Sequence, residues 1–151
     1  MAEPAVRRTV DGEFIESLDR PPFALQLGLE PHPEGGWYAR TWTSPHSLEV
    51  DGKIRPAATL ILFLLPAGEA SAWHRVSSTE FWIWNGLGPI ALELGGSGDK
   101  PATDASFELG ERMPQLEIPA GTWQRTLRSG TDSLASCMVS PGFSFDDFVL
   151  A

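Results

Sequence analysis

The stretch AWHRVSSTEFWIWNG, positions 72–86, holds residue types that could carry out chemistry. His74 is followed by Glu80, and Trp82 and Trp84 come at the next two alternate positions. Because successive side chains of an extended strand point to opposite faces, Glu80, Trp82 and Trp84 are predicted to share one face. A strand that directs a carboxylate and two indoles the same way either lines a cavity or pairs with a neighbour. We name both tryptophans as candidate ligand-binding residues.

Acid–base catalysis is the chemistry that His74 and Glu80 suit. Burial beside aromatic rings disfavours a charged carboxylate, so the pKa of Glu80 is expected to be raised. His74 could act as the partner acid or base near neutral pH. Both are therefore candidate catalytic residues. Two alternatives stay open, a mutually satisfied buried pair or a pair at a strand end in water. An ion pair from Arg40 or Arg75 would lower the pKa of Glu80.

The stretch PHPEGGW, positions 31–37, is a second candidate for function. Its prolines stiffen the chain, and its two glycines allow a turn or a close approach to a ligand. Glu34 stands beside those glycines and is predicted to bind a ligand. His32 is expected to be exposed in a loop.

Three more side chains are candidates for ligand binding. Tyr38 and Arg40 alternate on the strand WYARTW and suit a hydroxylated or anionic ligand, by hydrogen bonds and a bidentate fork. A solvated arginine on an edge strand is the alternative for Arg40. Asp146 is expected to face either the pocket mouth or water. Three nearby phenylalanines are expected to pack in the core: Phe143, Phe145 and Phe148.

Short strands are expected to position these residues. Thirteen prolines and fifteen glycines are spread along the chain, and long amphipathic patterns are scarce. The segment GEFIESLDR, positions 12–20, predicts one or two helical turns that end at the following prolines. The rest alternates β-rich runs with Gly/Pro turns, which is typical of a sandwich or barrel. The predicted strands lie within 35–44, 57–65, 79–86, 89–96, 105–110, 114–121, 122–130 and 133–143.

Composition narrows the classes of function. A chain of 151 residues suits about one domain, and a net charge of −9 argues against nucleic acid as a partner. The longest apolar run, AATLILFLLPAG, is too short to span a bilayer, and the N-terminus lacks the apolar stretch of a signal peptide. Cys137 is the one cysteine, which rules out an intrachain disulfide and suits a reducing, cytoplasmic setting. Cys137 itself is expected to be a small buried apolar residue.

Two segments resemble the paired motifs of the cupin superfamily. His74 and Glu80 fall where the first motif has its first histidine and its glutamate, and Val76 falls on the second histidine. The segment PAGTWQ, positions 119–124, is similar to the second motif, with Gln124 in place of its histidine. This resemblance keeps two of the four metal ligands of the superfamily.

A closer resemblance is to the DUF985, or cupin-5, family. Four segments in the same order carry it: LGLEPHPEGGWYARTW, SAWHRVSSTEFWIWNG, PQLEIPAGTWQ and VSPGFSFDDFVL. It implies an all-β fold, a double-stranded β-helix or cupin jelly-roll barrel, with a short N-terminal helical segment, residues 1–24, before a cupin domain over 25–151. It also implies a homodimer, but no settled activity. The sequence departs from the family pattern at WIWNGLGP and at Val149, both on the expected pocket rim.

The resemblance also bears on metal binding. If a divalent metal binds, its ligands are expected to be His74, Glu80 and Gln124. However, an amide oxygen is a weak ligand, and Val76 supplies none. We therefore expect no tightly bound metal, with Gln124 instead orienting a ligand by donating and accepting hydrogen bonds.

The leading hypothesis for function is a barrel that binds a small polar, sugar-like molecule, with acid–base isomerase, epimerase or lyase chemistry. Two other classes stay open. One is a non-catalytic small-molecule binding or sensing module, and the other is a weak metalloenzyme using His74 and Glu80.

Overall fold

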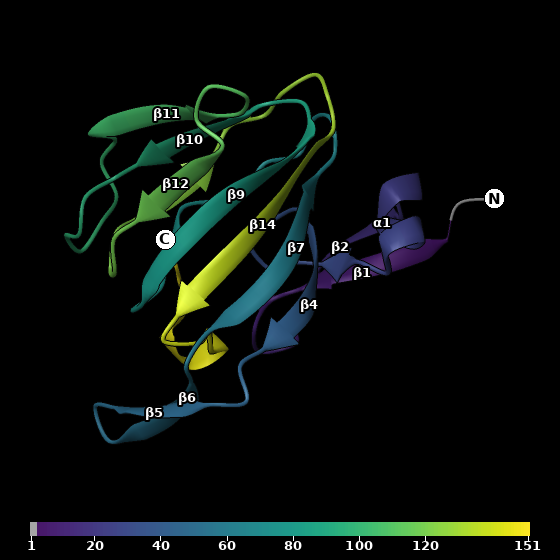
Figure 1. Cartoon of the computed structure of the whole chain (residues 1–151). Helices are drawn as coiled ribbons and strands as arrows, with labels where there is room; N and C mark the ends of the chain where they lie inside the picture. Colours follow the sequence, from purple (N-terminus) through teal and green to yellow (C-terminus); the bar gives the residue numbers. More distant parts are fainter. Residues whose placement is uncertain (1–2) are drawn as a thin grey trace.

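The computed structural model describes residues 3–151, and two antiparallel sheets dominate it (Figure 1). The six-stranded sheet has the order β12-β9-β14-β7-β4-β3, and the five-stranded sheet has the order β11-β10-β13-β8-β15. The predicted all-β jelly roll is therefore confirmed, and the sheets do not close completely into a barrel. Within the described residues, no helix is long and apolar enough to cross a membrane.

The strands of the two sheets are short, as the frequent prolines and glycines predicted. The six-stranded sheet consists of β3 Glu30–Pro31, β4 Trp37–Thr43, β7 Thr59–Leu65, β9 Thr79–Leu87, β12 Gln115–Ile118 and β14 Ser133–Ser140. The five-stranded sheet consists of β8 His74–Arg75, β10 Ile90–Leu94, β11 Ala105–Leu109, β13 Gln124–Thr126 and β15 Val149–Leu150. A short 3-10 helix, η1, covers Phe145–Asp147.

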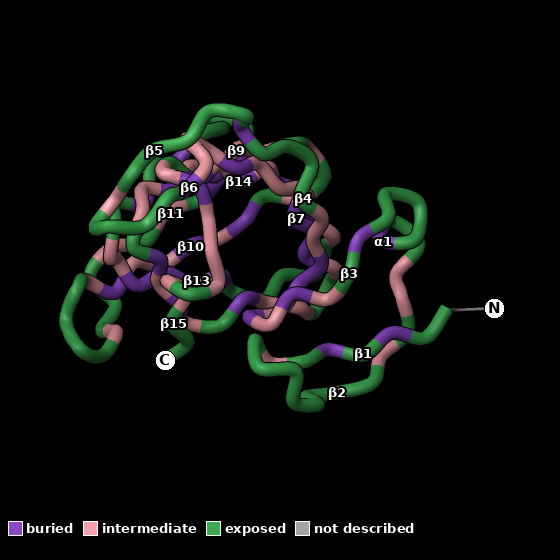
Figure 2. The backbone as a smooth tube through the Cα atoms, turned by 90° about the horizontal axis from the view of Figure 1, so that it is seen from below, coloured by how far each residue is buried: buried purple, intermediate pink, exposed green. Residues whose placement is uncertain are grey.

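The main core lies between the two sheets, because apolar side chains alternate toward the interior on strands of both. Phe63 and Trp82 come from the six-stranded sheet, and Leu92 and Leu109 come from the five-stranded one. Cys137 belongs to the same cluster and is 2% exposed, as expected of a small buried apolar residue. Figure 2 shows the buried parts of the chain along the strands that surround this interior.

The N-terminal region differs from the sequence prediction. The segment GEFIESLDR was expected to be helical, but Phe14–Asp19 form strand β2, which pairs with β1, Pro4–Arg8. The partner strand decides the outcome, since the segment is too short to be a stable helix alone. The short helix of this region, α1, covers Pro22–Leu27, so it begins at the prolines that were expected to end the predicted one. Its proline stands in the first turn, where a missing N–H costs nothing.

Two hairpins stand apart from the sheets. One is β1–β2, and the other is formed by β5, Ser47–Val50, and β6, Lys53–Pro56. Figure 1 shows β5–β6 projecting from one end of the molecule and β1–β2 lying beside β4 and α1. Both hairpins carry exposed apolar side chains, with Phe14 61% exposed and Ile54 80% exposed.

Candidate functional site

The pairing of the strands brings His74, Glu80 and Gln124 together. His74 on β8 lies directly opposite Gln124 on β13 in the five-stranded sheet. Glu80 is on β9 of the other sheet, opposite Val139 of β14. The Gln124 side chain crosses the interior and donates from Nε2 to Oε1 of Glu80 at 2.6 Å. The site is therefore built between the sheets, from segments that are far apart in the sequence.

A chain of hydrogen bonds fixes the orientation of Gln124. The indole Nε1 of Trp82 donates to Oε1 of Gln124 at 2.8 Å. An indole nitrogen can only donate, so the amide oxygen must face Trp82 and the amide nitrogen must face Glu80. The Oε1 atom of Glu80 is then an acceptor, and any proton on this carboxyl group lies on Oε2.

Burial changes the acid–base behaviour of Glu80. The residue is 8% exposed, and burial raises its pKa to about 7, while the hydrogen bond from Gln124 acts in the opposite direction. No arginine forms an ion pair with Glu80 within the described residues; Arg75 instead donates to the carbonyl of Gly98 and stacks on Trp123. Glu80 can therefore both donate and accept a proton near neutral pH.

The turn after β3 places Glu34 in the same interior. The amide of His32 donates to the carbonyl of Gly36, and the amide of Gly35 donates to the carbonyl of His32. Gly35 has φ +112°, and a Cβ atom there would lie 2.2 Å from the carbonyl oxygen of Ala70. The predicted turn is confirmed, and its glycine permits close approach to the protein's own backbone.

Glu34 is a second buried carboxyl group with an unusual environment. Burial raises its pKa well above the usual value, the charge of Glu80 raises it further, and the Ser71 hydroxyl and the charge of Arg7 oppose these effects. Its Oε2 lies 3.0 Å from Nδ1 of His74. The hydrogen on Nδ1 of His74 points at the backbone carbonyl of Ala72 instead of at Glu34. Oε2 of Glu34 is therefore the one buried side-chain oxygen or nitrogen without a hydrogen-bond partner among residues 3–151.

His74 is held as a neutral ring. Its Nδ1 lies 2.7 Å from the carbonyl oxygen of Ala72 and, facing an acceptor, must carry the hydrogen. Burial lowers the pKa of His74 to about 4, although the Ala72 carbonyl opposes this effect. At neutral pH the Nε2 atom of His74 therefore has a free lone pair, which makes it a weak base rather than the expected group that titrates near pH 7.

His32 was expected to be exposed, and this prediction is wrong. It is 3% exposed, and its Nδ1 accepts the amide hydrogen of Glu34 at 3.1 Å. Its pKa lies well below the usual value, because of burial first and then because protonated His32 would be repelled by His74, if that ring were protonated too, and by the charge of Arg7. Tyr38, Phe63, Phe145 and Phe148 surround the ring, the nearest being Tyr38 with centroids 4.5 Å apart. The flanking prolines suggested an exposed loop and gave no sign of this aromatic enclosure.

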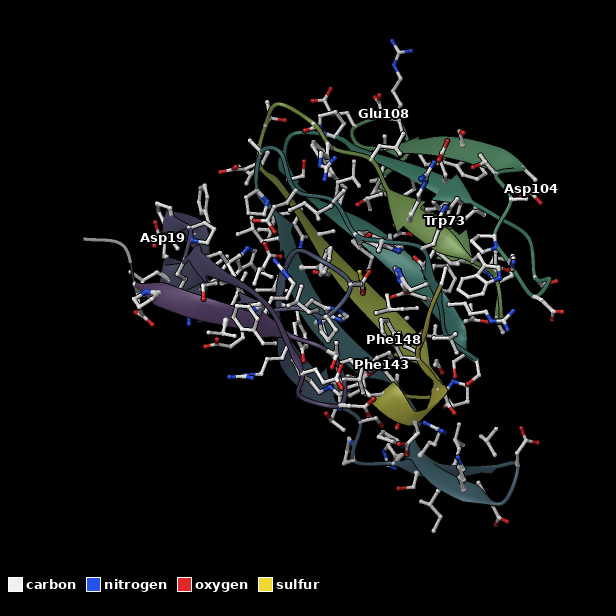
Figure 3. All side chains as sticks on the ribbon, turned by 180° about the vertical axis from the view of Figure 1, so that it is seen from behind. Asp19, Trp73, Asp104, Glu108, Phe143 and Phe148 are labelled. Carbon is white, nitrogen blue, oxygen red and sulfur yellow. The ribbon has the colours of Figure 1, made fainter. Side chains whose placement is uncertain are left out.

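One cavity joins these groups. Its polar lining comes from both carboxyl groups and both histidines, and its apolar lining comes from the surrounding strands and the C-terminal segment. Its volume of about 30 Å³ is room for about two waters. Figure 3 shows Phe143 and Phe148 close together beside the C-terminal segment, at one end of the molecule. The residues that line the cavity are His32, Glu34, Tyr38, Arg40, Thr59, Ile61, His74, Val76, Glu80, Cys137, Val139, Phe143 and Phe148.

The other predicted ligand-binding residues lie at different places. Tyr38 and Arg40 line the cavity, with Arg40 exposed and donating to the carbonyl of Phe143 at 3.3 Å. Gln124 and Trp82 are both outside the cavity lining: Trp82 donates to Gln124, and Gln124 donates to Glu80, which does line the cavity. Trp84 lies outside the cavity lining, where its indole donates to the carbonyl of Gly88. Asp146 is exposed on η1 and is also outside the lining.

The predicted ligand set of His74, Glu80 and Gln124 does not fit a divalent metal. Oε1 of Gln124 is occupied by the Trp82 indole, and Oε1 of Glu80 is occupied by the Gln124 amide. Val76 lines the cavity where a further ligand would be needed. No group of three or more His, Cys, Asp or Glu side chains suited to a metal occurs among the described residues. The chemistry considered below is derived from the protein's own side chains.

Comparison with known proteins identifies the family. The family model described as Cupin superfamily (DUF985) matches residues 23–151. This chain belongs to that family. The cupin is similar to a solved hypothetical protein from Leishmania major, with 29% identity, 85% of each chain covered and a TM-score of 0.75. It is also similar to a solved protein from Shewanella oneidensis, with 32% identity, 85% of this chain and 82% of that chain covered, and a TM-score of 0.73.

A more distant likeness shows the fold alone. The DMSP lyase DddQ from Ruegeria pomeroyi has 17% identity to this cupin and a TM-score of 0.51, with 76% of this chain and 51% of that chain covered. A comparison with curated proteins gives no match. The family and the fold are thus established, and the activity must be argued from the site.

Proposed function

We propose that this cupin binds a small polar molecule between its two sheets and that Glu80 exchanges a proton with it. The observation that carries the proposal is the pair of buried carboxyl groups in one cavity, one of which has an unpartnered oxygen. A buried polar atom without a partner is costly in free energy, and a ligand donor would remove that cost. The pKa of Glu80, about 7, suits proton transfer in either direction.

The arrangement of the cavity supports a ligand with an anionic or hydroxylated group at one end and an exchangeable proton at the other. Its inner end carries Glu34, Glu80 and the free Nε2 of His74, while Arg40 is exposed at its outer part. A guanidinium group suits an anionic or hydroxylated end of a ligand. The proton that Glu80 removes or returns would then lie at the other end, as in an isomerase, epimerase or lyase reaction.

The size of the cavity requires part of the protein to move. Space for about two waters cannot hold a sugar-sized molecule. Phe143 and Phe148 line the cavity from the C-terminal segment, and that segment is held by the short β15–β8 pairing and by an ion pair between Arg55 and Asp147. We expect this segment to shift outward when the ligand binds.

The test is ligand-induced thermal stabilisation across a panel of sugars, sugar nucleotides and small hydroxy acids, followed by a turnover assay on each stabilising compound. Binding of at least one compound is expected, with Glu80→Gln lowering its turnover by about a hundredfold or more. If turnover is unchanged in Glu80→Gln, the acid–base role is wrong. If compounds bind without turnover, the protein is a binding or sensing module. If no compound binds, the proposal fails.

We also propose that the protein acts as a homodimer in the cytoplasm. The exposed apolar side chains of the β1–β2 and β5–β6 hairpins support an interface between two copies, which would cover them.

A further inference from the structure

We infer that the N-terminal hairpin β1–β2 is a functional part of this site, because its Arg7 positions the turn that carries His32 and Glu34. The hairpin lies outside residues 23–151, the part that the family model matches. Figure 2 shows it beside the strands of the barrel, with β1 near β3. The importance of this arrangement for function rests on the proposed ligand site. The positioning of the turn by Arg7, however, is a property of the protein without a ligand.

Arg7 is a buried arginine whose donors are divided among the hairpin, the turn and Glu69. It is 4% exposed. Its Nη1 donates to the carbonyl of Gly36 at 2.8 Å and also to the carbonyl of His32. Its Nε donates to Glu16 of β2 at 2.9 Å, and its Nη2 donates to Glu69 at 3.0 Å. The guanidinium group thus donates hydrogen bonds to both ends of the turn, and Glu34 lies at the centre of that turn.

The position of Glu34 connects Arg7 to the ligand site. Glu34 lines the inner cavity and also a second, outer cavity between the hairpin and the barrel. Arg7, Glu16 and Leu18 form part of the hairpin wall of this outer cavity. The positive charge of Arg7 lowers the pKa of Glu34 and that of His32. Arg7 does not line the inner cavity, so it is a positioning residue and acts through the turn.

Arg20 provides a matched comparison within the same region. Its side chain is 9% exposed and pairs with Glu3 and Glu30, as the Arg7 side chain pairs with two glutamates. Both guanidinium groups also lie over the Trp37 ring, at 6.0 Å for Arg7 and 5.6 Å for Arg20. The carbonyl that Arg20 contacts belongs to Leu29, before the turn. A general stabilising role predicts equal effects of the two arginines, whereas positioning predicts an effect at the turn from Arg7 alone.

The experiment is NMR on the full chain without any ligand, in the variants Arg7→Ala, Arg7→Lys, Arg20→Ala and Arg20→Lys. Hydrogen exchange of the His32 and Gly35 amides reports the turn, and the side-chain ¹³C signal of Glu34 reports its titration. In Arg7→Ala, both amides should exchange about tenfold faster or more, and the titration midpoint of Glu34 should move upward because a positive charge is lost.

The lysine variant separates geometry from charge. Arg7→Lys keeps the positive charge but cannot reproduce the planar fork, so the two amides should exchange faster while the midpoint of Glu34 stays near the wild-type value. If Arg7→Ala does not fold, Arg7→Lys alone decides between positioning of the turn and a general stabilising role. The inference is overturned if the amides of the turn exchange at the wild-type rate in the Arg7 variants, or if the Arg20 variants change the turn and Glu34 equally. Neither result depends on whether a ligand is ever found.

Discussion

At the scale of single residues, the site depends on burying two carboxyl groups that solvent would otherwise keep ionised. Glu80 keeps one hydrogen bond from Gln124, and Glu34 has an oxygen with no donor. The desolvation that makes these groups useful for proton transfer also makes the folded protein less stable whenever they are charged. The stability of the protein should therefore report their titration.

The free energy of unfolding should depend on pH through Glu80. Its pKa is about 7 when folded and near the usual 4.5 when unfolded. The folded state thus binds more protons between these values, and this contribution to stability is full below pH 4.5 and is lost as pH rises through 7. His74, with a pKa lowered to about 4, contributes in the opposite sense between pH 4 and 6.5, so the wild type does not report Glu80 alone.

A variant isolates the contribution of Glu80. Glu80→Gln does not titrate, so its stability should improve relative to wild type by about 3 kcal/mol as pH rises from 4.5 to 7. Urea unfolding at intervals across this range measures the difference. Glu49→Gln, at an exposed position on β5, serves as the control for the loss of a carboxylate. If the stability difference between Glu80→Gln and wild type does not change across this pH range, the raised pKa of Glu80 is contradicted.

Gln124 gives a second prediction at this scale. Gln124→Leu leaves the Trp82 indole without its acceptor and the Glu80 carboxyl without its donor. The variant should lose about 2–4 kcal/mol of stability at pH 7, and the pKa of Glu80 should rise further. Gln115→Leu, at an exposed position on β12, is the matched control. A loss below 1 kcal/mol for Gln124→Leu, measured by urea unfolding, would show that the hydrogen-bond chain is not structurally important.

At the scale of elements, the turn between β3 and β4 shows why one glycine is needed. Gly35→Ala combines a positive φ with a Cβ atom 2.2 Å from the Ala70 oxygen. It should therefore destabilise the fold by about 3 kcal/mol or more. Gly52→Ala, at φ +77° with open space around the Cβ position, should cost about 1 kcal/mol. Thermal unfolding of the two variants checks this, and equal costs would rule out a close approach at Gly35.

The strands were predictable from sequence because each apolar or alternating run was bounded by glycine or proline. The eight predicted ranges contain β4, β7, β10, β11, β12, β13 and β14 and all but the last residue of β9, whereas β1, β2, β3, β5, β6, β8 and β15 lie outside them. The segment GEFIESLDR was misassigned because its pairing with β1 is a tertiary effect that no local pattern reveals. The turn after β9 was placed too early, since β9 continues through Asn85 and Gly86 to Leu87.

The candidate site was predictable only in part. The alternation along β9 placed Glu80 and Trp82 on one face, and the family motifs added His74 and Gln124. His32 was missed because its burial depends on aromatic rings from β4, from β7 and from the C-terminal segment, and the last two are far away in the sequence. Arg7 was missed because one of two adjacent arginines in an N-terminal segment gives no sign of the carbonyls that it contacts.

At the scale of the whole molecule, the exposed apolar side chains of the β1–β2 and β5–β6 hairpins predict self-association. Light scattering coupled to gel filtration should give a mass about twice the 16.4 kDa of one chain. Ile54→Lys and Phe14→Lys, at exposed positions on the two hairpins, should show which hairpin lies in the interface, because a buried lysine at its centre weakens association. A monomeric mass at micromolar concentration would contradict the dimer.

The central claim is that two coupled, buried carboxyl groups share the inner cavity and that one of them titrates near neutral pH. Side-chain ¹³C NMR of Glu80 and Glu34, followed from pH 4 to 9 and assigned with Glu80→Gln and Glu34→Gln, tests it most directly. We expect Glu80 to lose its proton near pH 7 and the midpoint of Glu34 to fall when Glu80 is replaced, since a neighbouring negative charge is removed. Two independent titrations at the ordinary carboxyl pKa, unchanged by either substitution, would contradict the account.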